Sequence, residues 1–267
     1  MELKQQTHSH MVRIGSVYTA DHHFFVPSKI RQIDVTTGEQ MKPINGLYAI
    51  VNEYSSIVHY FWTQSTSREE WLQAVKELKR RHLELCVPDP VAFMSDRCCD
   101  DKTAIRQVFV DAFVGGDVYH ILQRYVAAAS ARREHSPLLR RFILALTRSL
   151  VPDADPVTNR RPPLPDGKTM LSNVEKVVNE YKHTDVMNKK LLDTHETQKK
   201  HILNCLSTPA NVRYDINDRF KRQVLVRGTN KIENLWRHLR RITPETAGMQ
   251  LMECLAKIMF TNWNMDR

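Results

Sequence analysis

Residues 11–21 read MVRIGSVYTAD, a run of apolar, β-branched and aromatic residues that ends on an acid. Such side chains fit the pleated surface of a sheet, so we predict a core strand that finishes at Asp21. The polar turn TTGEQMKPING follows at 36–46, and then GLYAIVNEY at 46–54 and SSIVHYFWTQ at 55–64 predict two more strands. The chain therefore opens with three consecutive strands.

A helix is predicted next, over residues 65–82, because a Ser/Thr-rich cap precedes acids in the first turn and apolar residues at helical spacing. After the loop LCVPDP, the short run VAFMSD predicts a buried fourth strand that ends at Asp96 and lies beside the first. A helix over 101–109, a fifth strand within 110–117 and another helix follow. The order is β-β-β-α-β-α-β-α.

The pattern then becomes helical, and its segments are broken by the proline-rich stretch VPDADPVTNRRPPLPDG. We interpret residues 127–217 as an all-helical insertion. A turn at 228–230 precedes a helix that contains Glu233, and a last helix is predicted from about 244 to 262. The predicted domains are a first core segment at 11–126, the insertion at 127–217 and the C-terminal core helices at 218–267.

Composition narrows the class of protein. The 267 residues are 42% hydrophobic and have a net charge of +9, which suits a folded protein with a polyanionic partner such as nucleic acid. Five cysteines without a regular framework favour reduced thiols in an intracellular compartment. Cys98 and Cys99 have no partner at the spacing typical of zinc sites, so we expect no structural zinc. No signal peptide or membrane span is predicted.

Three acids occupy comparable places on this map. Asp21 and Asp96 end the first and fourth strands, and Glu233 lies in the first turns of a late helix. If the first strand lies between the second and the fourth, as in ribonuclease-H-like sheets, the two aspartates become neighbours and the helix adds the third carboxylate. Such a set suits Mg²⁺ or Mn²⁺, and two such ions can activate a water or a 3'-hydroxyl for phosphodiester chemistry.

Other readings of these residues stay open. Glu233 alone could be an ordinary surface charge. Asp101 is the main rival of Asp96 as the second acid. Four further acids lie near the same segments: Asp34, Asp100, Asp101 and Asp111. Trp236 is expected in the core. The cations around Glu233 predict a phosphate-facing surface, or else a solvated helix face: Arg227, Lys231, Arg237, His238, Arg240 and Arg241.

Asp117 and His120 form a second cluster at a strand-to-helix junction. Residues three apart share one side of the first helical turn, so the carboxylate can orient the imidazole. The plain alternative is a capping aspartate and a packed histidine.

Taken in order, TADHHFFVPSKI, MSDRCCDDK, GGDVYHILQRY, RGTNKIENLWRHLRRI and FTNWN resemble the catalytic domain of eukaryotic DDE transposases, over about residues 12–264. Within these, the chain is similar to the Mutator-like and hAT-related group, which has Asp or Cys two residues before a His between the second and third acids. The resemblance implies an α/β fold with a ribonuclease-H-like mixed sheet and a helical insertion before the last catalytic helix. It also implies that Asp21, Asp96 and Glu233 bind Mg²⁺ or Mn²⁺, with Asp117 and His120 as accessory residues.

The implied activity is cutting at element ends in DNA and joining of 3'-hydroxyls to target DNA by a nuclear, homo-oligomeric enzyme. No zinc-finger or helix-turn-helix region is recognisable, which departs from a full transposase and suggests a fragment or a reduced or domesticated element. The alternatives are a DNA-binding or chromatin-interaction protein without turnover, and a structure-specific nuclease with the same metal ligands.

Overall fold

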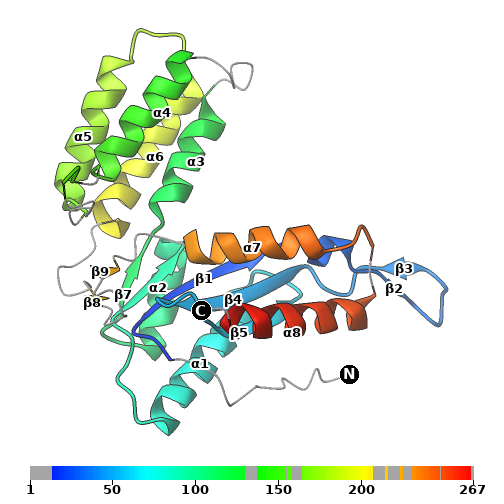
Figure 1. Ribbon diagram of the computed structural model, residues 1–267. Coiled ribbons are helices and arrows are strands. Elements are labelled where there is room, and N and C mark those ends of the chain that lie inside the picture. The colour runs from blue at the N-terminus through cyan, green and yellow to red at the C-terminus, as the bar shows by residue number, and fades with distance from the viewer. Residues whose placement is uncertain are drawn as a thin grey trace. The chain divides into compact units, whose positions relative to one another are not determined.

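The computed structural model describes residues 14–129, 137–153, 155–157, 164–206, 214–215, 223–224, 230–246 and 248–265. Its contacts divide the chain into two compact units (Figure 1). The first unit consists of Met1–Ser95, Asp100–Val114 and Thr229–Arg267, and the second of Asp96–Cys99 and Gly115–Gly228. No helix among the described residues is long and apolar enough to cross a membrane.

The first unit is built on a mixed five-stranded sheet in the order β5-β4-β1-β6-β7. Its strands are β1 Val17–His23, β4 Gly46–Asn52, β5 Ile57–Thr63, β6 Ala92–Ser95 and β7 Phe113–Gly115. The central strand β1 runs antiparallel to β4, with Asp21 opposite Ala49, and parallel to β6, with Ala20 beside Ser95. Every residue of β4 is buried, as expected for a strand covered on both faces.

Helices cover both faces of this sheet. On one face, Tyr48 of β4 stacks on Trp71 of α1 (Arg68–Glu84), and Phe93 of β6 stacks on Phe109 at the end of α2 (Cys98–Val108). The other face is covered by α7 (Asn230–Ile242) and α8 (Met249–Met265), which Figure 1 shows along the sheet. The core on that face contains Leu47, Ala49, Val51, Ile232, Leu235, Trp236, Leu239, Met252 and Ala256.

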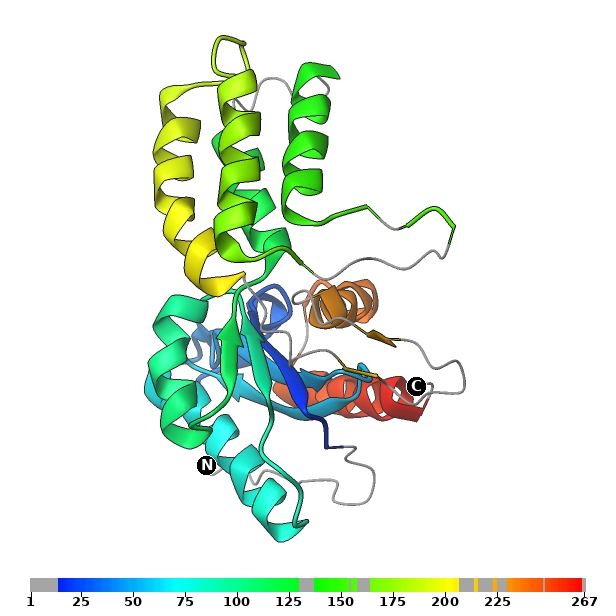
Figure 2. The ribbon, with the colours of Figure 1, turned by 90° about the vertical axis from the view of Figure 1, so that its left-hand side faces the viewer.

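In the described part of the second unit, four helices lie side by side (Figure 2). They are α3 Val118–Ala128, α4 Pro137–Leu150, α5 Gly167–Glu180 and α6 Lys189–Cys205. Three of them begin at side-chain caps: Asp117 caps α3, Asp166 accepts the backbone N–H groups of Lys168 and Thr169 in α5, and Asn188 accepts that of Leu191 in α6. Their apolar faces share one core, which includes Tyr125, Phe142, Met170 and Ile202.

The prediction of an α/β protein with a mixed sheet flanked by helices is confirmed. Sequence periodicity did not predict the short pairs β2 (Gln32–Ile33) with β3 (Gln40–Met41) and β8 (Tyr214–Asp215) with β9 (Gln223–Val224). Two-residue strands are too short to show an alternating pattern. The 3-10 turn Pro27–Lys29 was also unpredicted.

The helical unit begins earlier than the insertion expected at 127–217, because it includes Gly115 onward. The reason is the packing of α3, whose residues Val118, Ile121 and Tyr125 are buried in the same core as α4, α5 and α6. In the sequence, α3 looks like a continuation of the β-α alternation. Only its packing against α4, α5 and α6 shows that it belongs to the helical unit.

Candidate active site and a cysteine–histidine cluster

Asp21 lies on the face of β1 that α7 covers. Its side chain is 7% exposed, and Oδ2 accepts a 3.0 Å hydrogen bond from the indole N–H of Trp236. Oδ1 accepts the backbone N–H of His22 at 2.7 Å. Trp236 is itself buried, as predicted. A buried carboxylate needs such donors, so the bond fixes both the acid and the helix opposite it.

His23, two residues further, faces the same helix because alternate strand residues share a face. Its ring stacks on Trp236 with centroids 4.8 Å apart and planes 12° apart. Burial, and to a smaller extent the charge of Arg240, lowers the pKa of His23 to about 4. The ring is therefore neutral at physiological pH. His22 points to the opposite face, against Tyr48.

Glu233 lies in the first turn of α7, one turn before Trp236, and is partly exposed. Residues three apart on a helix have Cβ atoms about 5 to 6 Å apart. The side chain of Glu233 therefore leaves the helix backbone close to that of Trp236, whose indole binds Asp21. The buried stripe of α7 consists of Ile232, Leu235, Trp236 and Leu239. Glu233 lies at the edge of that stripe and therefore between the sheet and solvent.

Asp101 lies on the face of the sheet opposite to Asp21. In a parallel pair, neighbours point the same way, so Ser95 shares the face of Ala20, opposite to Asp21. The Ser95 hydroxyl donates to the carboxylate of Asp101, which places Asp101 on the face covered by α1 and α2. Asp96 is the next residue after Ser95, so continued alternation would direct it to the face of Asp21.

Asp117 caps α3. Its Oδ1 accepts the backbone N–H of Tyr119 at 2.8 Å, and its side chain is buried. Nε2 of His120 lies 3.9 Å from Oδ2 of Asp117, beyond hydrogen-bond length but close enough for charge interaction if the ring is protonated. Nδ1 of His120 lies 3.2 Å from Gln123 Oε1.

Four of the six predicted phosphate-binding residues have described side chains, and all four are exposed: Arg237, His238, Arg240 and Arg241. Arg227 lies outside the described residues, and the side chain of Lys231 does as well. At 100° per residue, Arg237 and Arg240 fall on the same flank of α7 as Glu233, whereas His238 falls on the other flank. The flank of the acid is therefore cationic.

Phe25 extends this surface and was missed by the sequence analysis. It is 39% exposed, with the ammonium group of Lys29 5.1 Å and the guanidinium carbon of Arg240 5.7 Å from its ring centroid. Such distances allow cation–π attraction. An exposed aromatic ring flanked by cations suits stacking on a base beside bound phosphates. The adjacent aromatic pair at 24–25 was the available signal in the sequence.

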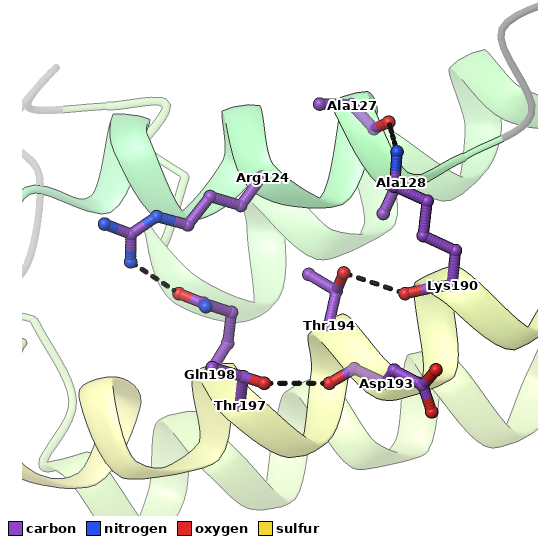
Figure 3. A pocket seen from close by; sticks show the side chains of 8 residues that line it. All are labelled: Arg124, Ala127, Ala128, Lys190, Asp193, Thr194, Thr197 and Gln198. Carbon is purple, nitrogen blue, oxygen red and sulfur yellow. Dashed lines mark hydrogen bonds between the residues drawn. The ribbon is translucent and has the colours of Figure 1, made fainter.

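An open groove of about 390 Å³ lies between α3 and α6 in the second unit (Figure 3). Its polar groups largely satisfy one another: Arg124 donates to Gln198 Oε1 at 3.0 Å, and Lys190 donates to the carbonyl of Ala127 at 3.3 Å. It contains no grouping of nucleophile, base or metal ligands among the residues that line it. We assign it no chemistry.

Four thiol and imidazole side chains of the second unit meet in one place: Cys98, Cys99, His201 and Cys205, here called the cysteine–histidine cluster. Their potential ligand atoms all lie within 4.8 Å of one another, and among the described residues no set of three carboxylates does so. Hydrogen bonding to Cys98 lowers the pKa of Cys205 to about 5. The same bond raises that of Cys98.

The sequence expectation of no zinc site overlooked this cluster, because it considered only ligands close together in the chain. The one local signal was the spacing of His201 and Cys205, four residues apart on one face of α6. The pair of adjacent cysteines is brought to them by the fold, from more than 100 residues away.

Comparison of the sequence with protein-family models found no match, and comparison with curated proteins found none.

Proposed function

We propose that the chain is a metal-dependent DNA-cutting and strand-transferring enzyme of the DDE transposase type, with a ribonuclease-H-like fold. The observation that supports it best is the hydrogen bond from Trp236 to Asp21. It holds the first turn of α7, which contains Glu233, beside the strand end that contains Asp21. Two acids 212 positions apart thereby share one side of the sheet.

The strand order supports the same proposal. Strand β1 lies between β4 and β6; Asp21 lies in β1, two residues before its end, and Asp96 is the residue after the parallel strand β6. Ligand sites of α/β sheets gather at the carboxyl ends of such strands. The order of five strands is also the one that the ribonuclease-H-like arrangement requires.

The donor chemistry fits the metal that this function needs. Carboxylate oxygens are hard ligands, which suit Mg²⁺ or Mn²⁺, and Asp21, Asp96 and Glu233 would hold the ion. A bound ion would supply activation of water or a 3'-hydroxyl and charge neutralisation at the phosphodiester. Arg237 and Arg240, on the flank of Glu233, would hold the DNA phosphates, and Phe25 would stack against a base. Asp117 and His120 remain accessory candidates.

The test is nicking of supercoiled plasmid by the purified chain in Mg²⁺ or Mn²⁺. Asp21→Ala, Asp96→Ala and Glu233→Ala should each reduce the rate by more than about 100-fold, because each removes a ligand of the metal. Asp111→Ala, an exposed acid in the same unit, should leave it unchanged. Equal nicking by all variants would refute the proposal. Strand transfer of a labelled 3'-hydroxyl end separates a transposase from a plain nuclease.

One observation favours a second candidate, a DNA-binding or chromatin-interaction protein without turnover. Both oxygens of Asp21 already accept hydrogen bonds, and the side chain is nearly buried. A metal must compete with these donors for the remaining lone pairs. Salt-sensitive DNA binding without nicking at any metal concentration would favour this candidate. In either case we expect DNA as the partner, a nuclear location and a homo-oligomer.

A further inference from the structure

We propose that the cysteine–histidine cluster is a structural zinc site with four ligands, Cys98, Cys99, His201 and Cys205. The proposal is independent of the carboxylate chemistry, because the cluster shares no residue with the candidate active site. It concerns the second unit alone, to which all four residues belong.

The distances match a tetrahedral ion. Zinc binds cysteine sulfur at about 2.3 Å and histidine nitrogen at about 2.0 to 2.1 Å, so tetrahedral ligands lie roughly 3.5 to 3.8 Å apart. Cys99 Sγ lies 3.3 Å from both Cys205 Sγ and His201 Nδ1, and Cys205 Sγ lies 4.0 Å from His201 Nδ1. All four ligand atoms fall within 4.8 Å. Shifts of up to about 1 Å would bring the four ligand atoms to these separations.

The set of donors selects zinc. Three thiolates with one imidazole form a common structural zinc set, and soft sulfur ligands exclude Mg²⁺ and Ca²⁺. A disulfide is the competing use of two close cysteines. The 3.3 Å between Cys99 and Cys205 sulfurs is well beyond the roughly 2.05 Å of a disulfide bond, and a disulfide would also leave Cys98 and His201 unused.

The backbone around the cluster is packed to hold it. The N–H of Gly116 donates to the carbonyl of Cys205 at 2.8 Å. A Cβ at Gly116 would lie 3.0 Å from Cys98 Sγ and 3.2 Å from Cys205 Cβ, so a larger residue here would press on both cysteines. His201 and Cys205 present their side chains together because they lie one helical turn apart in α6.

A zinc ion here would fasten two segments that are distant in sequence. These are Cys98 and Cys99 at the start of α2, and His201 and Cys205 in the last turns of α6. Cys98 is only two residues after Asp96, so the ion would also restrict the backbone that follows β6. Closing a loop of about 100 residues by such a link stabilises the fold chiefly by restricting the unfolded chain.

The experiment measures metal in the untagged, full-length chain, purified without chelator and then passed over a desalting column. We expect about one zinc ion per chain by mass spectrometry of the elements. Replacement by Co²⁺ should produce the intense visible bands of tetrahedral cobalt with thiolate charge transfer. Both measurements use the unmodified protein, so they do not depend on whether any variant folds.

Variants locate the site. Cys99→Ser and His201→Ala should lower zinc content at least about tenfold, whereas Cys254→Ser, at an exposed cysteine outside the cluster, should retain it. His201→Cys keeps four ligands and should retain the metal with a changed cobalt spectrum. Zinc-free protein that also fails to bind added Zn²⁺ or Co²⁺ would overturn the proposal. So would a Cys99–Cys205 disulfide in the native protein, or equal metal loss in Cys254→Ser.

Failure of this proposal and failure of the proposed function are distinguishable. Plasmid nicking in Mg²⁺ reports on Asp21, Asp96 and Glu233, and zinc content reports on the cluster. A chain that binds zinc but does not nick plasmid would support the zinc site and refute the proposed enzyme activity.

Discussion

Trp236 Nε1 lies 3.0 Å from Asp21 Oδ2, and this hydrogen bond joins α7 to the central strand of the sheet. Residues 21 and 236 lie at opposite ends of the sequence. The bond is buried, the acceptor is a carboxylate, and the indole also stacks on His23. Both the stability of the first unit and the position of Glu233 therefore depend on it.

Trp236→Phe should lower the free energy of unfolding by about 1 to 3 kcal/mol, because it keeps an aromatic ring and removes the indole N–H that donates to Oδ2 of the buried Asp21. Chemical denaturation followed by circular dichroism measures this. Trp62→Phe, at a partly buried tryptophan packed on the same core, is the matched control and should cost less. Equal losses for the two variants would show that the hydrogen bond contributes nothing.

Asp96→Asn should abolish metal-dependent nicking, whereas Asp101→Asn should preserve most of it. The reason is the sheet: Asp101 binds Ser95 on the face covered by α1 and α2, opposite to Asp21. The same plasmid assay distinguishes them. If Asp101→Asn is inactive and Asp96→Asn is active, the strand alternation does not continue past Ser95 and the second acid is Asp101.

Acid should destabilise the protein through His23. Its folded pKa of about 4 lies below the ordinary 6.5, so between these values the unfolded chain binds a proton that the folded chain does not. The stabilisation is complete above about pH 6.5 and is lost as pH falls, by roughly 2 kcal/mol at pH 5. His59, with a pKa lowered to about 4 by burial and by Arg81, adds to the effect.

His23→Phe keeps an aromatic ring on Trp236 and removes the titrating group. Its free energy of unfolding should therefore vary less between pH 7 and pH 5 than that of the unmodified chain. His183→Phe, at an exposed position, is the control and should leave the pH dependence unchanged. An unchanged slope in His23→Phe would mean that this ring does not stay neutral in the fold.

Arg240→Gln should weaken DNA binding and make it less sensitive to salt, because each phosphate contact changes the slope of log affinity against log salt by about 0.9. Titrations of fluorescent duplex DNA at several salt concentrations give the slope. Lys76→Gln, at an exposed cation of α1 on the other face of the sheet, should leave it unaltered. If the slope of log affinity against log salt is the same for both variants, the DNA does not bind at the flank of α7 that contains Arg240.

Gly116→Ala should reduce zinc content and lower the midpoint of thermal unfolding, because its methyl group would press on Cys98 and Cys205. Gly248→Ala meets nothing within 4 Å and has no left-handed backbone requirement, so it is the matched control. If Gly116→Ala has unchanged zinc and stability, the contact relaxes without consequence for the cluster.

The strands of the sheet were readable from the sequence because each is a short apolar, β-branched run that ends at a turn or an acid. Buried strands and their helices occur where predicted, and β1 lies between β4 and β6 as the proposed arrangement requires. The short pairs β2–β3 and β8–β9 could not be read, since two residues give no period. The packing of α3 with the helical unit depends on partners that local periodicity does not reveal.

The sequence by itself determined the α/β class, the order of the main elements, the position of Asp96 directly after the fourth predicted strand, and that of Glu233 in the first turn of a late helix. The first strand was predicted to finish at Asp21, and it runs two residues further, to His23. Only the tertiary structure decided three further points. It paired Asp21 with Trp236, placed Asp101 on the opposite face from Asp21, and gathered Cys98 and Cys99 with His201 and Cys205. Local patterns report the period and the ends of each element, whereas contacts between residues a hundred or more positions apart exist only after the chain has folded.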